Sequence, residues 1–163
     1  MPEKETLRKA RQDKREGKAP STQAGEFVHE EIEHIRHGKH GARSAKQAIA
    51  IGLSKARRAG VKLPPPAKGR TSASTRKQAE RDLDKGKSHT KPSPARSRAA
   101  RAALKDEGQS AASHTALSRH AISAASHRTA TSRRAAAVKA VRTKGPAGRH
   151  RAAVKAAKTR ARG

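Results

Sequence analysis

The side chains best suited to chemistry gather in one short stretch, where four histidines alternate with three glutamates: His29, Glu30, Glu31, Glu33, His34, His37 and His40. Imidazole and carboxylate groups are ligands of zinc. His34 and His37 are three positions apart and would share one face of a helix. The same spacing also produces ordinary helical i,i+4 pairs of glutamate with histidine. A solvated helix surface explains the stretch without an ion, so we expect no metal and no cofactor.

No catalytic motif accompanies these residues. The chain has no cysteine, which excludes thiol nucleophiles, disulfides and cysteine-ligated zinc. It has no Walker-type glycine loop and no Gly-x-Ser-x-Gly elbow. After His29-Glu30, the zinc-protease pattern needs a histidine where Glu33 stands. We therefore expect a protein that is not an enzyme.

The strongest chemical signal is positive charge. The chain holds 40 Lys and Arg against 13 Asp and Glu, a net charge of +27, and residues 108–163 contain thirteen basic residues and no acid. Such a segment neutralises nucleic-acid phosphates and releases their counterions, so binding should weaken steeply with salt. On a helix, we expect the set Arg134, Lys139 and Arg142 and the set Arg151, Lys155 and Lys158 to spread around the surface. That arrangement favours wrapping along a phosphate backbone over reading bases.

The predicted nucleic-acid contacts come from a helical module and from the basic region beyond it. The module supplies Lys39, Arg43, Lys46, Arg57 and Arg58. The later region supplies Arg96, Arg133, Arg134, Lys139, Arg142, Lys144, Arg149, Arg151, Lys155, Lys158, Arg160 and Arg162. We expect duplex DNA as the partner, bound largely without sequence preference by a nucleoid-associated, histone-like protein of the cytoplasm.

The elements that position these residues must be mostly α-helical and built around a small core. There are 34 Ala but only 17 Leu, Ile, Val and Phe together. About a tenth of the chain is thus bulky and apolar, too little for one large packed domain. The longest apolar run, residues 48–53, is too short to span a membrane. The N-terminus lacks the apolar region of a secretory signal.

The apolar residues concentrate in a helical hairpin over about residues 21–60. Its first helix carries a stripe at helical spacing, with Ser21 or Thr22 as the expected cap and Gly38 as the stop: Ala24, Phe27, Val28, Ile32 and Ile35. Its second helix runs from Ser44 to Ala59 before Gly60 and carries a stripe of small residues, which permits close helix packing. Because two such helices bury only about ten apolar side chains, we expect a homodimer to complete the core.

The remaining chain divides around this hairpin. We expect a charged, marginal helix at 1–19, the helical module at 20–63, a proline-rich linker at 64–73, a short helix at 74–86 and a tail at 87–163. The tail is rich in Ala, Ser, Arg and Lys. Because it has little to bury and its charges repel one another, we expect it to be largely disordered alone and helical when bound to phosphates.

The module carries four stretches that resemble a known family: Ser21-Thr22-Gln23-Ala24-Gly25-Glu26-Phe27-Val28, Glu31-Ile32-Glu33-His34-Ile35-Arg36, Gly38-Lys39-His40-Gly41-Ala42-Arg43-Ser44, and residues 46–61. Together they resemble small basic bacterial proteins of unknown function, some of which are labelled DNA-binding or plasmid-stabilisation proteins. The tail, with Ser93-Pro94-Ala95-Arg96, is similar to the tails of linker histones and histone-like bacterial proteins. The resemblance implies a DNA-associated role in bacteria.

Three other functions remain open from the sequence. The chain could be an RNA- or ribosome-associated basic protein. It could be a plasmid-stabilisation or regulatory factor that reads DNA through the hairpin, although the six-residue connection at 38–43 is longer than the usual three or four of a helix-turn-helix. Binding to a membrane surface is weaker, because the tail has no bulky apolar face to insert.

Overall fold

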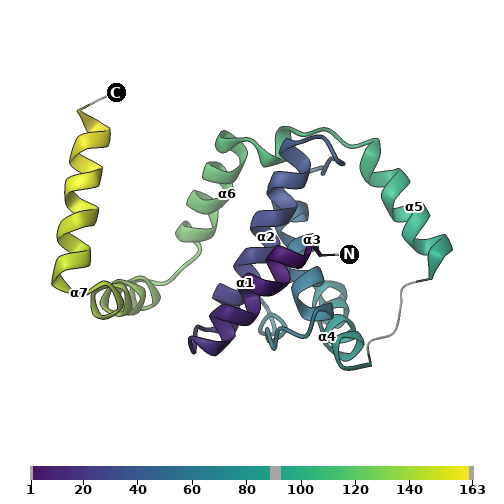
Figure 1. Cartoon of the computed structure of the whole chain (residues 1–163), viewed down its shortest axis with the longest axis horizontal. Helices are drawn as coiled ribbons and strands as arrows, with labels where there is room; N and C mark the ends of the chain where they lie inside the picture. The colour runs from purple at the N-terminus through teal and green to yellow at the C-terminus, as the bar shows by residue number, and fades with distance from the viewer. Residues whose placement is uncertain (1, 89–92, 162–163) are drawn as a thin grey trace. The chain divides into compact units, whose positions relative to one another are not determined.

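The computed structural model describes residues 2–88 and 93–161, and all regular structure in those ranges is helical. The elements are α1 (Lys4–Arg15), α2 (Pro20–Arg36), α3 (Ala45–Arg58), α4 (Ala73–Ser88), α5 (Pro94–Lys105), the short 3-10 helix η1 (Ser110–Ala112), α6 (His114–Ser126) and α7 (Ala130–Arg160) (Figure 1). The prediction of a mostly α-helical chain is confirmed. The chain divides into two compact units, Met1–His120 and Ala121–Gly163, and α6 crosses the division.

Helices α2 and α3 form the hairpin expected over about residues 21–60. The predicted cap of α2 is wrong: the helix begins at Pro20 after Ala19, and no side chain caps it. Proline suits this position because it has no N–H to satisfy and its φ angle is already helical. Ser44 does cap α3, since its Oγ accepts a hydrogen bond from the Gln47 amide at 3.2 Å. Gly38 and Gly60 follow the two helices with φ of 69° and 89°, a conformation that favours glycine.

The two helices are in close contact at Gly52. A Cβ atom added there would lie 2.7 Å from Val28 Cα and 3.0 Å from the Phe27 carbonyl oxygen. Backbone atoms cannot move aside without separating the helices. The stripe of small residues on α3 therefore has the purpose expected from the sequence, with Ala45, Ala48 and Ala56 buried beside Gly52.

Replacing Gly52 with alanine should destabilise the first unit. We expect a loss of about 1–2 kcal/mol, since overpacking a helix contact costs about 1–3 kcal/mol and the better helix propensity of alanine returns part of it. The matched control is Gly25→Ala in α2, where an added Cβ meets no atom within 4 Å and should stabilise the helix by about 0.5–1 kcal/mol. Urea unfolding of both variants measures the difference; equal effects would contradict the close contact.

Helix α1 covers one end of the hairpin. Ala10 is buried in a cluster with Ala24, Phe27, Ala56 and Val61, and Leu7 packs against its edge. The helix predicted to be marginal at 1–19 thus gains stability from tertiary packing, which is how most short amphipathic helices persist in proteins.

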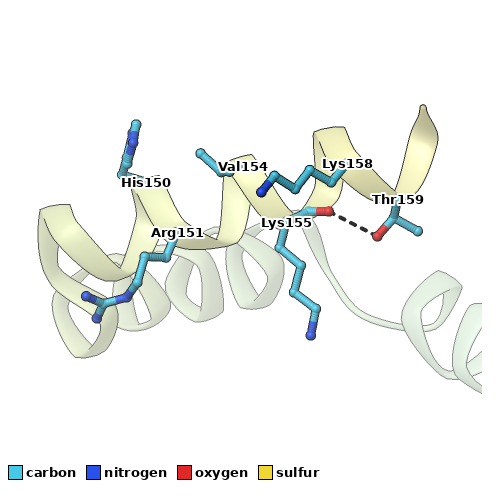
Figure 2. Close-up of a pocket in the computed structure, with 6 residues that line it drawn as sticks. All are labelled: His150, Arg151, Val154, Lys155, Lys158 and Thr159. Atoms are coloured by element: carbon cyan, nitrogen blue, oxygen red, sulfur yellow. Dashed lines mark hydrogen bonds between the residues drawn. The ribbon is translucent and has the colours of Figure 1, made fainter. Parts of the chain in front are cut away.

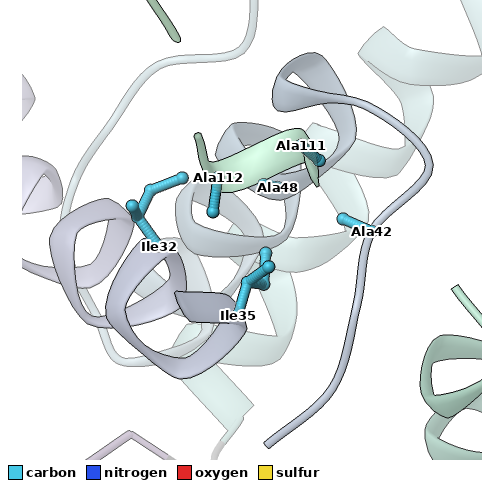
Figure 3. Close-up of a cluster of buried hydrophobic side chains, with 6 residues drawn as sticks. All are labelled: Ile32, Ile35, Ala42, Ala48, Ala111 and Ala112. Carbon is cyan, nitrogen blue, oxygen red and sulfur yellow. The ribbon is translucent and has the colours of Figure 1, made fainter. Parts of the chain in front are cut away.

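The other end of the hairpin is covered by η1. Figure 3 shows Ala111 and Ala112 lying over Ile32, Ile35, Ala42 and Ala48. The connection after α2 binds the segment that precedes η1 through two backbone hydrogen bonds. The Gly41 amide donates to Leu104 O at 2.8 Å, and the Ala42 amide donates to Gly108 O at 3.0 Å. Because α1 and η1 complete the core within one chain, the core no longer calls for a homodimer. A dimer stays a prediction that light scattering would test.

The tail differs from expectation. The prediction of a largely disordered tail is wrong for the described residues, which form α5, α6 and α7. Alanine has the highest helix propensity, and repulsion between two exposed cations costs only a few tenths of a kcal/mol. Thr129 also caps α7, because its Oγ1 accepts a hydrogen bond from the Ser132 amide at 3.1 Å.

Helix α7 is broken once, at Gly145 and Pro146. Gly145 has φ of 62° and ψ of 179°, which lies outside the helical region. Proline disfavours a helical conformation in the residue before it and removes an amide donor, while glycine tolerates the positive φ. The element therefore consists of two shorter helices that meet at this dipeptide. Within the described ranges, none of the helices combines the length and apolar character needed to cross a membrane.

Candidate nucleic-acid interface

Four of the five predicted module residues are exposed: Lys39, Arg43, Lys46 and Arg58. Lys39 is paired with Glu3, with Nζ 2.9 Å from Oε1, and this hydrogen bond is the main cause that lowers the pKa of Glu3 to about 2. Arg43 has its Nε 3.3 Å from Glu107 Oε1 but remains largely in solvent. Lys46 is exposed and has no acidic partner among the described residues. Arg43 and Lys46 are therefore the module cations most open to a polyanion.

Arg57 and Arg58 make contacts within the fold, and the side chain of Arg58 is 41% exposed. Arg57 is only 7% exposed, and its guanidinium donates to the carbonyl oxygens of Leu63 and Pro64 at 3.2 and 3.3 Å. Burial lowers the pKa of Arg57. Arg58 binds the buried Asp82 with Nε 2.8 Å from Oδ1.

Asp82 explains why Arg58 is engaged. Its carboxylate also accepts hydrogen bonds from Ser54 Oγ at 2.6 Å and from Gln78 Nε2 at 3.0 Å, so that α3 and α4 meet at one satisfied buried acid. Close by, Gly86 lies so near the Arg57 carbonyl oxygen that an added Cβ would be 2.2 Å from it. The sequence gives no sign of the contact between α3 and α4, since Ser54 and Arg58 lie more than twenty positions from Asp82.

Arg43 and Lys46 line a shallow hollow of about 330 Å³ together with Arg119 and His120 from α6. The remaining lining residues are small and polar or apolar: Ser44, Ala45, Ser110, Ala111 and Ala116. The hollow exists because η1 packs against the start of α3 and leads directly into α6. His120 and this grouping were missed from sequence, because the residues that meet here are separated by more than seventy positions.

Beyond the module, Arg96 lies exposed on α5, a helix that has no buried residue. The predicted cations of α7 whose side chains are described are all exposed: Arg133, Arg134, Lys139, Arg142, Arg149, Arg151, Lys155, Lys158 and Arg160. The side chain of Lys144 and the whole of Arg162 lie outside the described residues.

Arg151, Lys155 and Lys158 do not spread around the helix as expected. They occupy positions i, i+4 and i+7, which fall on one face, and Figure 2 shows Arg151 and Lys155 extending from the same side of α7. With His150, Val154 and Thr159 they line an open hollow of about 480 Å³. Thr159 is tied to the helix backbone, since its Oγ1 donates to Lys155 O at 3.0 Å. We call Arg151, Lys155 and Lys158 the cationic stripe.

Arg149 and Arg160 lie on the face opposite the cationic stripe. They are eleven positions apart, close to three helical turns, and each is displaced from the stripe by about half a turn. The second half of α7 thus has one face with a row of three cations and an opposite face with two. This pair provides a matched control for the stripe.

Residues 5–68 match the model of a family described as a family of unknown function, DUF6496. A search of curated proteins and a search of solved structures each found no match. The family match covers α1 after its first residue, α2, α3 and the prolines that follow, in keeping with the resemblance of the module to an uncharacterised family. Its description states no ligand and its range stops before α4, so the first three helices are similar to a family of unknown function while the acid-free helix α7 lies outside the match.

Proposed function

We propose that this chain is a non-enzymatic, nucleoid-associated protein that binds duplex DNA through its phosphates, largely without sequence preference. The observation that carries the proposal is the unpaired cationic surface of α7. Residues 108–163 contain no acid, and none of the described α7 cations has an ion-pair partner. A polyanion would supply the missing partners.

The first unit offers a contrast that supports this proposal. Some of its cations are paired with acids within the fold, as in the pairs Lys18 with Asp13, Lys55 with Glu31 and Arg58 with Asp82. The cations of α7 instead repel one another, since Arg151 and Lys155 are like charges at i,i+4. Phosphate binding would relieve this repulsion and release condensed counterions, so both effects favour association.

The side chains of α7 favour contact that is largely independent of sequence. Of the side chains that commonly read bases, α7 has no Asn, Gln or acid and offers only Arg and Lys, which also bind phosphates. The basic hollow lined by Arg43, Lys46, Arg119 and His120 would add phosphate contacts from the first unit. These groups position a duplex but carry no sequence information.

Competition and co-purification together test the proposal. We expect the full chain to prefer duplex DNA over structured RNA at equal salt, and sequencing of nucleic acid purified with the protein to return DNA from all parts of the genome. A preference for RNA in both measurements would favour the ribosome-associated alternative. Recovery of one defined DNA site would favour a regulatory or plasmid-stabilisation factor.

The cationic stripe gives a sharper prediction. The double variant Arg151→Gln/Lys155→Gln should lower DNA affinity and reduce the slope of log affinity against log salt by about two, because each phosphate contact contributes about 0.9 to that slope. The matched variant Arg149→Gln/Arg160→Gln removes the same charge from the opposite face and should change the slope less. Fluorescence anisotropy across a salt series measures both; equal slopes would show that α7 is contacted all around.

A further inference from the structure

The end of α2 and the connection after it bring together three groups that the proposed function does not use. Glu31, His34 and His40 each direct a possible ligand atom toward the others, and these atoms all lie within 4.8 Å of one another. Glu31 is fully buried, and the two histidine side chains are 14% and 16% exposed. In the sequence, His34 and His37 have the spacing that places two side chains on one helical face. In the structure, His37 is 70% exposed and its ring contacts the backbone of Glu33 instead.

Two carboxylate oxygens at this place are buried without a hydrogen-bond partner, Glu30 Oε1 and Glu31 Oε1. They are the only side-chain atoms in this condition among the described residues. Burying a carboxylate oxygen without a partner is costly, and such atoms in a folded protein call for an explanation. Glu31 Oε1 lies 3.3 Å from His40 Nε2, and Glu30 Oε1 lies 3.9 Å from His34 Nε2.

The hydrogen bond on the other side of the His40 ring decides what its Nε2 can offer. Nδ1 lies 3.0 Å from the Gly41 carbonyl oxygen, which can only accept, so Nδ1 carries the proton. In the neutral ring Nε2 therefore presents a lone pair to a carboxylate oxygen. With the ring neutral, Nε2 and Glu31 Oε1 are two acceptors 3.3 Å apart, and a metal ion between them would satisfy both. A backbone carbonyl that fixes the ring in this way is the usual second partner of a metal-bound histidine.

We propose that Glu31, His34 and His40 bind one divalent transition-metal ion, with Zn²⁺ as the best fit. Two imidazoles and a carboxylate form a mixed nitrogen and oxygen set that zinc accepts, whereas Mg²⁺ and Ca²⁺ prefer oxygen alone. Zinc-to-ligand distances of about 2.0–2.1 Å place tetrahedral ligands roughly 3.3 Å apart, so ligand atoms that lie up to 4.8 Å apart need to close by as much as about 1.5 Å. These three side chains leave the fourth position of a tetrahedral ion to water.

Neighbouring groups already hold the carboxylate and one imidazole. Lys55 Nζ donates to Glu31 Oε2, which leaves Oε1 free to face the histidines. His34 Nε2 lies 2.8 Å from Glu3 Oε1, so Glu3 competes for the same nitrogen and has to release it when the ion binds. The ion would then link α2 to the connection after it. In that connection, the Gly41 amide is hydrogen-bonded to the segment before η1.

Metal titration of the full chain, stripped with a chelator, tests this site. We expect one equivalent of Co²⁺ to give the intense visible bands of a four-coordinate ion, and Zn²⁺ to displace it. His34→Ala and His40→Ala should each weaken binding by about tenfold or more. The controls are His29, which is exposed on α2, and His37, the exposed residue that follows α2. His29→Ala and His37→Ala should leave the metal affinity unchanged.

Two further measurements distinguish loss of the metal site from loss of the fold. His40 lies in a connection rather than in a helix, so circular dichroism should show that His40→Ala retains its helices. Zn²⁺ should raise the melting temperature of the original chain and of His37→Ala but not of His40→Ala. Absence of four-coordinate Co²⁺ bands, or equal binding by the His34, His37 and His40 variants, would overturn the site. None of these readouts depends on DNA binding.

Discussion

Removal of residues 127–163 is expected to lower the affinity for duplex DNA by orders of magnitude and to flatten its dependence on salt. The deletion removes twelve basic residues and no acid. If about half of them contact phosphates, the slope of log affinity against log salt becomes shallower by about five. Titration of a labelled duplex at several salt concentrations measures both quantities.

The position of the cut matters because the basic region and the core overlap in sequence. A deletion that starts at residue 108, where the acid-free region begins, would also remove Ala111 and Ala112 from the core of the first unit. A cut after Ser126 keeps η1 and the whole of α6. The control is thermal unfolding of the shortened chain, which should retain the melting transition of the first unit. An unchanged salt slope in that folded chain would disprove binding through α7.

The second large effect is expected from Gly41→Ala. An added Cβ at this position would lie 1.7 Å from the Glu107 carbonyl oxygen and 2.7 Å from that of Gly108, so the segment before η1 has to move away. Overpacking costs about 1–3 kcal/mol, and the two backbone hydrogen bonds of Gly41 and Ala42 contribute about 1 kcal/mol each. We expect a total loss of about 3–5 kcal/mol, measured by urea unfolding of the full chain.

The matched control for this variant lies across the same contact. At Gly108 an added Cβ meets no atom within 4 Å, so Gly108→Ala should change the stability by less than about 1 kcal/mol. Hydrogen exchange adds a local reading, because the Gly41 and Ala42 amides should lose protection in Gly41→Ala and keep it in Gly108→Ala. Similar stability of the two variants would show that η1 is not seated on the connection after α2.

Local signals in the sequence were sufficient for the hairpin. The stripe on α2, the start of the second helix at Ser44 and the stop at Gly60 are each encoded within a few residues, and the structure has all three. The cover supplied by η1 could not be predicted in this way. Ala111 and Ala112 fill space beside Ile32 and Ile35 because they are small, and small residues in an alanine-rich chain give no sign of which of them is buried.

The candidate interface shows the same division. Charge counting identified the cations of α7, and the structure shows that the described ones are exposed. Such a count depends only on composition and requires no knowledge of the fold. It could not separate Arg57 and Arg58 from Lys46, because burial against Leu63 and pairing with Asp82 depend on contacts between elements. Counting positions around the helix would have identified the cationic stripe, as Arg151, Lys155 and Lys158 follow the helical period directly. The sequence could not predict that His34 lies near His40 rather than beside His37, because this depends on the path of the chain after α2.

The break at Gly145 and Pro146 sets how far α7 can follow a curved partner. An unbroken helix of 31 residues would be a straight rod of about 46 Å, longer than one turn of duplex DNA at roughly 34 Å. A straight rod touches a cylinder along a short tangent and leaves its ends away from the surface. Two rods of about 22 Å joined at a dipeptide can each lie tangent at a different point. Replacing Gly145 and Pro146 with alanine would straighten the rod and shorten the phosphate track that one chain can occupy.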